Sequence, residues 1–170
     1  MAPEASSRAA PKLPAALGRY EILSLLGAGG MAQVYLALQR GAFASEKLVV
    51  IKQLRPELVS DQVFLTMFMD EARIALQLHH PNVVHTYEVG AEAGDYFLAM
   101  EFLEGLTLTQ IVRKAGVGGL PLNLHLWILS QVLAGLSYAH ELRALDGEPL
   151  GIVHRDVSPS NVMITSSGEV

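Results

Sequence analysis

The ten residues from Ile152 to Asn161 constrain this chain more than any other stretch. They read Ile-Val-His-Arg-Asp-Val-Ser-Pro-Ser-Asn, which sets a carboxylate, Asp156, and an amide, Asn161, five residues apart in a short polar segment. Phosphoryl transfer needs a carboxylate that orients the attacking hydroxyl and oxygen ligands for Mg²⁺ beside the phosphates. The spacing indicates that chemistry, although a polar turn after a helix would leave the same pattern.

The same run resembles the catalytic loop of eukaryotic-type serine/threonine protein kinases, including those of bacteria, in which His-Arg-Asp is followed by Asn five residues after the Asp. The resemblance implies that Asp156 is the catalytic base and Asn161 a metal ligand. It also implies an α+β, protein-kinase-like fold. A five-stranded antiparallel N-lobe sheet with one helix is expected first, followed by the first helices and the catalytic loop of a mainly helical C-lobe.

Composition excludes several classes of function. The 170 residues suffice for one domain or slightly more, with about 70% of the unfolded surface buried on folding. Charged residues make up 17% and the net charge is −5, so the clustered Lys and Arg of a nucleic-acid surface are not indicated. The chain has no Cys, which removes disulfides, thiolate metal sites and a Cys nucleophile, and agrees with a reducing, cytoplasmic location.

Two segments could be mistaken for targeting or membrane signals. Residues 1–19 are rich in Ala, Pro and Ser without an apolar run long enough for a signal peptide, which predicts a disordered leader. Residues 115–140 lack Asp, Glu, Lys and Arg over a length that could span a bilayer, but glycines, Pro121 and several polar side chains interrupt them. Apolar residues at helical spacing instead predict a buried globular helix from about Asn123 to Leu142, and no membrane segment.

A glycine-rich turn follows the first predicted strand, which starts at Tyr20. Its glycines let the backbone approach a phosphate closely, and the residues after them are β-forming. A Rossmann site needs a helix there and a Walker A loop needs Gly-Lys-Ser/Thr, so both are disfavoured, while a plain glycine-rich hairpin stays open. The turn resembles the kinase glycine loop, with Ala32 in place of the third Gly. The resemblance implies nucleotide contacts from Leu26, Gly27, Ala28, Gly29, Gly30 and Val34.

Lys52 lies near the end of an apolar run, residues 47–53, that predicts a buried strand. A Lys in this place is often an edge residue whose charge reaches solvent. The run resembles the kinase Val-Ala-Ile-Lys strand, which implies that Lys52 holds the α- and β-phosphates of a nucleotide and pairs with a helix Glu. Val50 stands where the family usually has Ala, which implies a tighter adenine slot.

A helix is predicted from Asp61 to about Leu78, with Asp61 or Ser60 as its cap. The kinase resemblance makes Glu71 the partner of Lys52, although an ordinary exposed helix charge fits as well. The residues expected on the buried face of this helix are Val63, Met67, Ile74 and Leu78.

Three histidines surround the end of this helix. His79, His80 and His85 could indicate a metal site, but no Cys and no nearby acidic cluster supports one. His80-Pro81-Asn82 instead resembles the kinase turn after this helix, and we favour that interpretation.

Two further strands, 83–89 and 96–102, are predicted about a Gly94-Asp95 turn. The segment that follows stands at the spacing of the kinase hinge. The resemblance implies that backbone groups of Glu101 and Leu103 bond the adenine edge, while Met100 gates the pocket behind, although Met100 as plain core fits equally. Adenine would be sandwiched by the glycine loop together with Val34, Val50, Met100 and Met163.

A short helix from Leu106 to Lys114 is predicted next. Residues 20–102 then form the N-lobe and residues 103–170 part of the C-lobe.

Two departures from the kinase pattern matter. Ser158 stands where the family usually has a Lys that neutralises the transferred phosphate, which implies slow turnover. Pro159 still resembles serine/threonine kinases, so Ser or Thr hydroxyls of proteins are the expected acceptors. Asp-Phe-Gly does not follow within 170 residues, so we expect an N-terminal portion of a kinase that self-associates through exposed C-lobe surface.

Two classes of function therefore remain. The first is a protein kinase that transfers the γ-phosphate of ATP, with Mg²⁺, to Ser or Thr hydroxyls of protein substrates. The alternative is a non-catalytic nucleotide-binding or regulatory module similar to a pseudokinase. An in-frame Asp-Phe-Gly beyond codon 170 would favour the first.

Overall fold

The computed structural model describes residues 13–41 and 44–170. The chain forms two compact units: Met1–Phe68 with Val89–Ala99, and Met69–Glu88 with Met100–Val170. Residues 69–88 thus cluster with the C-terminal half, and the predicted boundary between residues 102 and 103 stays a prediction. Each unit is described by itself.

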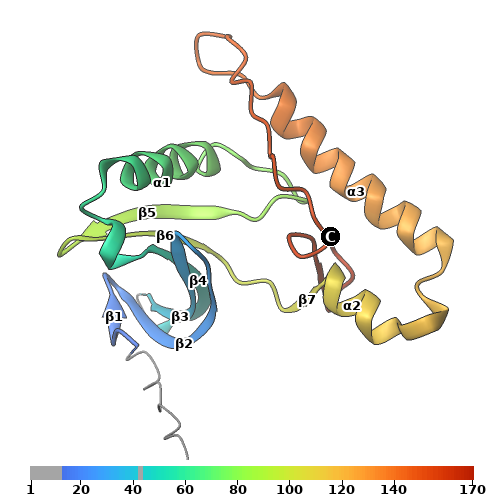
Figure 1. Cartoon of the computed structure of the whole chain (residues 1–170), viewed down its shortest axis with the longest axis horizontal. Helices are drawn as coiled ribbons and strands as arrows, with labels where there is room; N and C mark the ends of the chain where they lie inside the picture. Colours follow the sequence, from blue (N-terminus) through green and yellow to red (C-terminus); the bar gives the residue numbers. More distant parts are fainter. Residues whose placement is uncertain (1–12, 42–43) are drawn as a thin grey trace, which may run out of the picture. The chain divides into compact units, whose positions relative to one another are not determined.

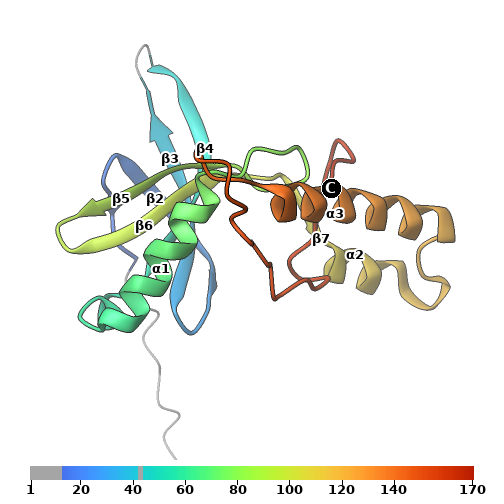
Figure 2. The ribbon, with the colours of Figure 1, turned by 90° about the horizontal axis from the view of Figure 1, so that it is seen from above.

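The strands of the first unit belong to a six-stranded sheet in the order β1-β2-β3-β4-β6-β5 (Figure 1). Residues 86–88 of this sheet, in β5, and 100–101, in β6, cluster with the second unit. Its strands are β1 (Ala16–Leu17), β2 (Tyr20–Ala28), β3 (Ala32–Arg40), β4 (Glu46–Leu54), β5 (Thr86–Glu92) and β6 (Asp95–Glu101). Neighbouring strands from β1 to β4 pair antiparallel, and Figure 2 shows β3 and β4 running side by side. Together with the helices, this sheet confirms the predicted α+β architecture.

The sheet has one strand more than the five predicted. The additional strand β1 lies inside the predicted leader, whose residues 1–12 are outside the described part of the chain. Leu17 is buried, and the Ile22 N–H donates to the Ala15 carbonyl at 3.1 Å. Gly18 makes the two-residue turn between β1 and β2 with a φ of 56°, which suits glycine. Burial of Leu17 explains why the end of the leader is ordered.

Alternating side chains of the first three long strands form the core of this unit. Buried residues recur at every second position, as Tyr20 and Ile22 do in β2 and Val49 and Ile51 in β4. The Phe97 ring packs edge-on against Tyr20, with centroids 5.9 Å apart and ring planes at 83°. Period-two burial explains why the predicted strands from Tyr20 to Gln53 are found.

The turn between β5 and β6 is Ala93-Gly94, one residue earlier than predicted. Both residues have positive φ, 52° and 90°, which is the backbone of a type I′ hairpin turn. Residues 83–85, predicted as strand, instead belong to a loop in which the Val83 N–H donates to the His80 carbonyl at 3.0 Å.

Helix α1 (Gln62–Ala75) begins as predicted, because the Asp61 carboxylate accepts a hydrogen bond from the Val63 N–H at 2.9 Å. It ends three residues before the predicted Leu78. The predicted buried face is wrong, since Val63, Met67 and Ile74 are exposed. Phe68 and Ala72 are buried instead, one helical turn apart.

The second unit contains a two-stranded sheet and two further helices (Figures 1 and 2). These elements are β7 (Gly105–Thr107), α2 (Leu108–Ala115), α3 (Leu122–Glu141) and β8 (Met163–Thr165). Helix α2 begins two residues later than predicted, because Leu106 and Thr107 pair with β8. Thr107 and Gln110 form a reciprocal capping box, with bonds of 3.2 and 2.9 Å.

Helix α3 has the predicted bounds to within one residue but only a narrow buried face. Ile128, Gly135 and Ala139 are its buried residues. The expectation of a buried helix is therefore wrong for the opposite face, where Leu126 and Leu133 are more than half exposed. In the described part of the chain, no helix combines the length and apolar character that crossing a bilayer would require.

Candidate active site

The segment predicted as a catalytic loop brings its acid and its amide together. The Asn161 Nδ2 donates to the Asp156 carboxylate Oδ2 at 2.8 Å and to the Asp156 carbonyl at 2.9 Å. The Asn161 N–H also donates to the Ser158 carbonyl at 2.9 Å, which closes the loop between them. Because the Asn161 Nδ2 makes both contacts with Asp156, the Asn161 Oδ1 is the side-chain atom that could bind a cation.

The backbone before Asp156 is held in an unusual conformation. Arg155 has a φ of 63°, in the left-handed region, which costs a residue with a Cβ about 1–2 kcal/mol. The Asp156 N–H donates to the His154 Nδ1 at 3.2 Å, so the proton of a neutral His154 ring sits on Nε2. Backbone strain of this kind persists where surrounding hydrogen bonds hold it. Here the strained Arg155 directly precedes Asp156 and helps to set the direction of its carboxylate.

Sheet register places several predicted nucleotide contacts on one face of the first unit. Val34 lies directly opposite Lys52 in the β3–β4 pair. Leu36 lies opposite Val50 in the same pair, two positions along each strand, so Val34, Val50 and Lys52 share a face.

The glycine loop joins β2 to β3 beside this face. The Gly29 N–H donates to the Ala32 carbonyl at 2.8 Å. A Cβ added at Gly27 or Gly30 would meet no atom of the described residues within 4 Å, and neither φ lies in the left-handed region. Neither packing nor backbone conformation therefore requires glycine at these two positions.

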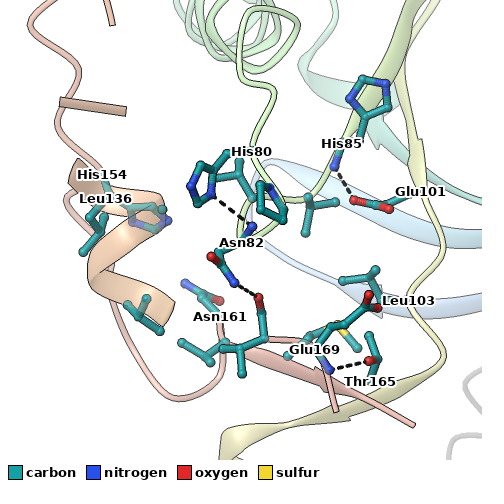
Figure 3. Close-up of a pocket in the computed structure, with 18 of the residues that line it drawn as sticks. His80, Asn82, His85, Glu101, Leu103, Leu136, His154, Asn161, Thr165 and Glu169 are labelled. Carbon is teal, nitrogen blue, oxygen red and sulfur yellow. Dashed lines mark hydrogen bonds between the residues drawn. The ribbon is translucent and has the colours of Figure 1, made fainter. Parts of the chain in front are cut away.

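A cavity of about 680 Å³ opens within the second unit (Figure 3). Four predicted site residues line it: Glu101, Leu103, Asn161 and Met163. Ser158, the departure from the kinase pattern, lines it as well, and its hydroxyl lies 2.8 Å from that of Ser160. The cavity thus joins the predicted hinge to the end of the predicted catalytic loop.

Glu101 is bonded to the loop that precedes β5. Its N–H donates to the His85 carbonyl at 2.9 Å, and its carboxylate accepts from the His85 N–H at 2.6 Å (Figure 3). With the N–H engaged, the Glu101 carbonyl is the backbone group left to face a ligand. This limits the predicted adenine contact at Glu101 to an acceptor.

The remaining predicted residues do not line this cavity. Lys52 and the glycine loop belong to the first unit, whereas Glu71 lies in the part of α1 that belongs to the second. Met100 and Asp156 are in the second unit, outside the cavity lining. The pairing of Lys52 with Glu71, and the roles of all these residues, stay predictions.

Asn82 and Gly135 are site residues that the sequence reasoning missed. The Asn82 Nδ2 donates to the Val170 carbonyl at 2.7 Å (Figure 3). It also donates to the Gln131 Oε1 at 3.4 Å. A Cβ at Gly135 would lie 2.8 Å from the Asn82 carbonyl oxygen, so glycine lets α3 approach the loop. A lone glycine within a helical pattern was the available signal for this contact.

A metal centre of three or more protein ligands is not found among the described residues. No group of three His, Cys, Asp or Glu side chains there could hold an ion. A divalent ion at Asn161 would therefore take most of its ligands from phosphates and water, as Mg²⁺ commonly does.

Comparison with known proteins finds protein kinases similar to this chain. The tyrosine-protein kinase MasK of Myxococcus xanthus is 42% identical over 155 residues, which are 90% of this chain and 24% of that protein. The serine/threonine-protein kinase PrkC of Bacillus subtilis is 37% identical over 90% of this chain and 22% of that protein. The crystal structure of the Mycobacterium tuberculosis PknI kinase domain superposes with a TM-score of 0.72 at 29% identity, covering 93% of this chain and 60% of that one.

The chain therefore spans about a quarter of the length of these curated relatives. The likeness to PknI confirms the predicted protein-kinase-like fold. Residues 20–170 match the family model of the protein kinase domain, and the chain belongs to that family.

Proposed function

We propose that this chain is the nucleotide-binding and catalytic-loop portion of a protein kinase that transfers the γ-phosphate of ATP to a protein hydroxyl. The observation that carries the proposal is the pair of hydrogen bonds joining Asn161 to Asp156. Asp156 orients the acceptor hydroxyl and takes its proton, while Asn161 offers an oxygen to a divalent ion. Asn161 would help to hold Mg²⁺, and the bound ion would supply positive charge against the negative charge that develops on the phosphate.

The residues of the first unit fit a nucleotide. Gly27 and Gly30 have no packing or backbone reason to be glycine, which favours close approach of a ligand to their N–H groups. Val34 and Val50 lie on the same face of β3 and β4 as Lys52. In the proposed complex, Lys52 holds the phosphates and is oriented by Glu71. Adenine contacts come from Leu26, Ala28, Val34, Val50, Met100, Glu101, Leu103 and Met163.

Ser or Thr is the proposed acceptor, on the resemblance of Pro159 to serine/threonine kinases. A second acceptor, Tyr, is favoured by one observation: the relative at 42% identity is named a tyrosine-protein kinase. Phosphoamino-acid analysis of a phosphorylated protein substrate separates the two, because the three phosphoesters migrate differently. We further propose a cytoplasmic location, where ATP is available.

Nucleotide binding tests the proposal on the chain itself. Titration with fluorescent Mg-ATP should give saturable binding that Lys52→Met weakens by about tenfold or more, since a charge-assisted bond to phosphate contributes about 1.5–3 kcal/mol. Lys47→Met is the matched control, because Lys47 lies in the same strand with the same charge, and its affinity should match wild type. Equal affinity in all three proteins would contradict the proposed site.

Binding without transfer would favour the alternative, a non-catalytic nucleotide-binding or regulatory module. That outcome needs the full-length product of the gene, assayed for phosphate transfer beside the same Lys52→Met variant. Nucleotide affinity with no transfer from the wild-type product would exclude the enzyme and retain the module.

A further inference from the structure

The three histidines between α1 and β5 have different surroundings. His80 stacks on Tyr138 with centroids 5.1 Å apart, and its Nδ1 accepts a hydrogen bond from the Asn82 N–H at 3.1 Å. His79 and His85 instead face each other, with their Nδ1 atoms 3.3 Å apart. Of the three histidines, His80 therefore contacts Tyr138 and Asn82, whereas His79 and His85 contact each other.

The facing pair has the geometry of two ligands on one ion. Imidazole nitrogens bound to a tetrahedral Zn²⁺ at about 2.0–2.1 Å lie about 3.3–3.4 Å from each other. The observed Nδ1–Nδ1 distance is 3.3 Å. The ring centroids are 5.1 Å apart and the ring planes are at 45°, so the two nitrogens meet at an angle. The same contact also meets the geometry of a hydrogen bond in which one Nδ1–H donates to the other Nδ1.

Both histidines are held by their backbones. The His79 N–H donates to the Tyr138 hydroxyl at 3.0 Å. The His85 N–H and carbonyl are both bonded to Glu101, at 2.6 and 2.9 Å. Two ligands fixed in advance lose little conformational freedom when an ion binds, which raises the affinity of a site with few ligands.

The pair is also accessible and chemically suited to a metal. His79 is exposed and His85 half-buried, so an ion reaches both nitrogens from solvent. The Glu101 carboxylate is engaged with the His85 backbone and acts there as a support. With no third ligand among the described residues, water completes the coordination.

We propose that His79 and His85 form a two-histidine site for Zn²⁺ or a similar late first-row divalent ion. Imidazole pairs favour such ions over Mg²⁺, which prefers oxygen ligands. The site lies in the second unit, where His79 and His85 line the same cavity as Asn161 but supply nitrogen and not oxygen ligands. Its occupancy would tie the end of α1 to the start of β5 and, through His85, to Glu101.

Zinc titration of the purified chain tests the site. Isothermal calorimetry with ZnCl₂ should show one saturable event, weakened about tenfold or more in His79→Ala, because the second ligand of a pair adds an intramolecular binding step. His85→Ala should give the same loss. His125→Ala is the matched control, since His125 is exposed on α3, and should leave the affinity unchanged.

Circular dichroism of each variant checks that the fold is kept, and exposed His79 provides the variant least able to disturb it. If wild type and His79→Ala bind zinc with equal affinity, the contact between the two rings is only a hydrogen bond, and the proposal is overturned. Absence of saturable zinc binding by the wild type would do the same.

Discussion

Replacing Gly105 by Ala perturbs the contact that positions the predicted adenine residue Met163. Gly105 lies opposite Thr165 in the β7–β8 pair. An added Cβ would lie 2.8 Å from the Ile164 carbonyl carbon and 2.8 Å from the Thr165 Cα, with the Ile164 carbonyl oxygen nearer still. All three atoms belong to the backbone, so no side chain can turn aside and the strands must separate.

The magnitude follows from how little holds this ladder together. Three residue pairs make it up: Gly105–Thr165, Leu106–Ile164 and Thr107–Met163. Overpacking a close contact costs about 1–3 kcal/mol. Because each 1.4 kcal/mol is about tenfold in an equilibrium constant, opening of the ladder should become about 5- to 150-fold more frequent.

Amide hydrogen exchange measures that opening locally. Peptides covering residues 103–108 and 162–167 should exchange faster in Gly105→Ala by the factor above, while peptides of β2 and β3 are unchanged. Gly118→Ala is the matched control, because a Cβ there meets no described atom within 4 Å. Unchanged protection in Gly105→Ala would refute the reasoning that backbone proximity requires this glycine.

Three further predictions concern other parts of the molecule. Ser158→Lys in a catalytically active protein should raise kcat, since a charge-assisted bond to the transferred phosphate is worth roughly 1.5–3 kcal/mol; an unchanged kcat would mean that another cation fills that place. Residues 1–170 alone should self-associate through the exposed side chains of Leu126 and Leu133 on α3, which light scattering measures as a raised apparent mass. The double substitution Leu126→Ser with Leu133→Ser should lower that mass, and a monomeric wild-type chain would contradict the prediction. Burial, followed by the Asp95 and Glu57 carboxylates, raises the pKa of Tyr35 above 10.0, so the stabilisation it gives is complete below that pH and is lost as pH rises through the folded-state value. Tyr35→Phe should therefore lessen the alkaline fall in urea midpoint, and an identical pH profile would refute the assignment.

The fold could be predicted where one physical pattern dominates. Runs of β-forming and apolar residues predicted β2, β3 and β4, and the Asp61 cap predicted the start of α1. The acid and the amide five residues apart were predicted to lie on one ordered loop, and within it Asn161 donates hydrogen bonds to Asp156. Each of these depends on neighbours in sequence, which a single chain displays.

The errors arose where neighbours in space decide. Val63 and Met67 are as apolar as Phe68, so composition could not tell which face of α1 is buried. The turn after β5 shifted by one residue because Ala93 accepts a positive φ beside Gly94. Leu17 was assigned to a leader because only its contact with the rest of the first unit shows that it is buried.

The histidines show the same limit within the site. Spacing treats His79, His80 and His85 as equivalent, and only the loop conformation turns His80 toward Tyr138 and leaves the other two facing each other. Likewise, nothing in the sequence around Gly135 predicts that its Cα lies against the Asn82 carbonyl oxygen.

Phosphate transfer by the full-length gene product, wild type against Asp156→Asn, tests the central claim most directly. The substitution keeps the size of the side chain and removes the base that accepts the hydroxyl proton, so transfer of labelled γ-phosphate from ATP to protein should fall about 10²–10⁴-fold with the fold intact. A rate within about threefold of wild type would contradict the assignment of Asp156 as the catalytic base.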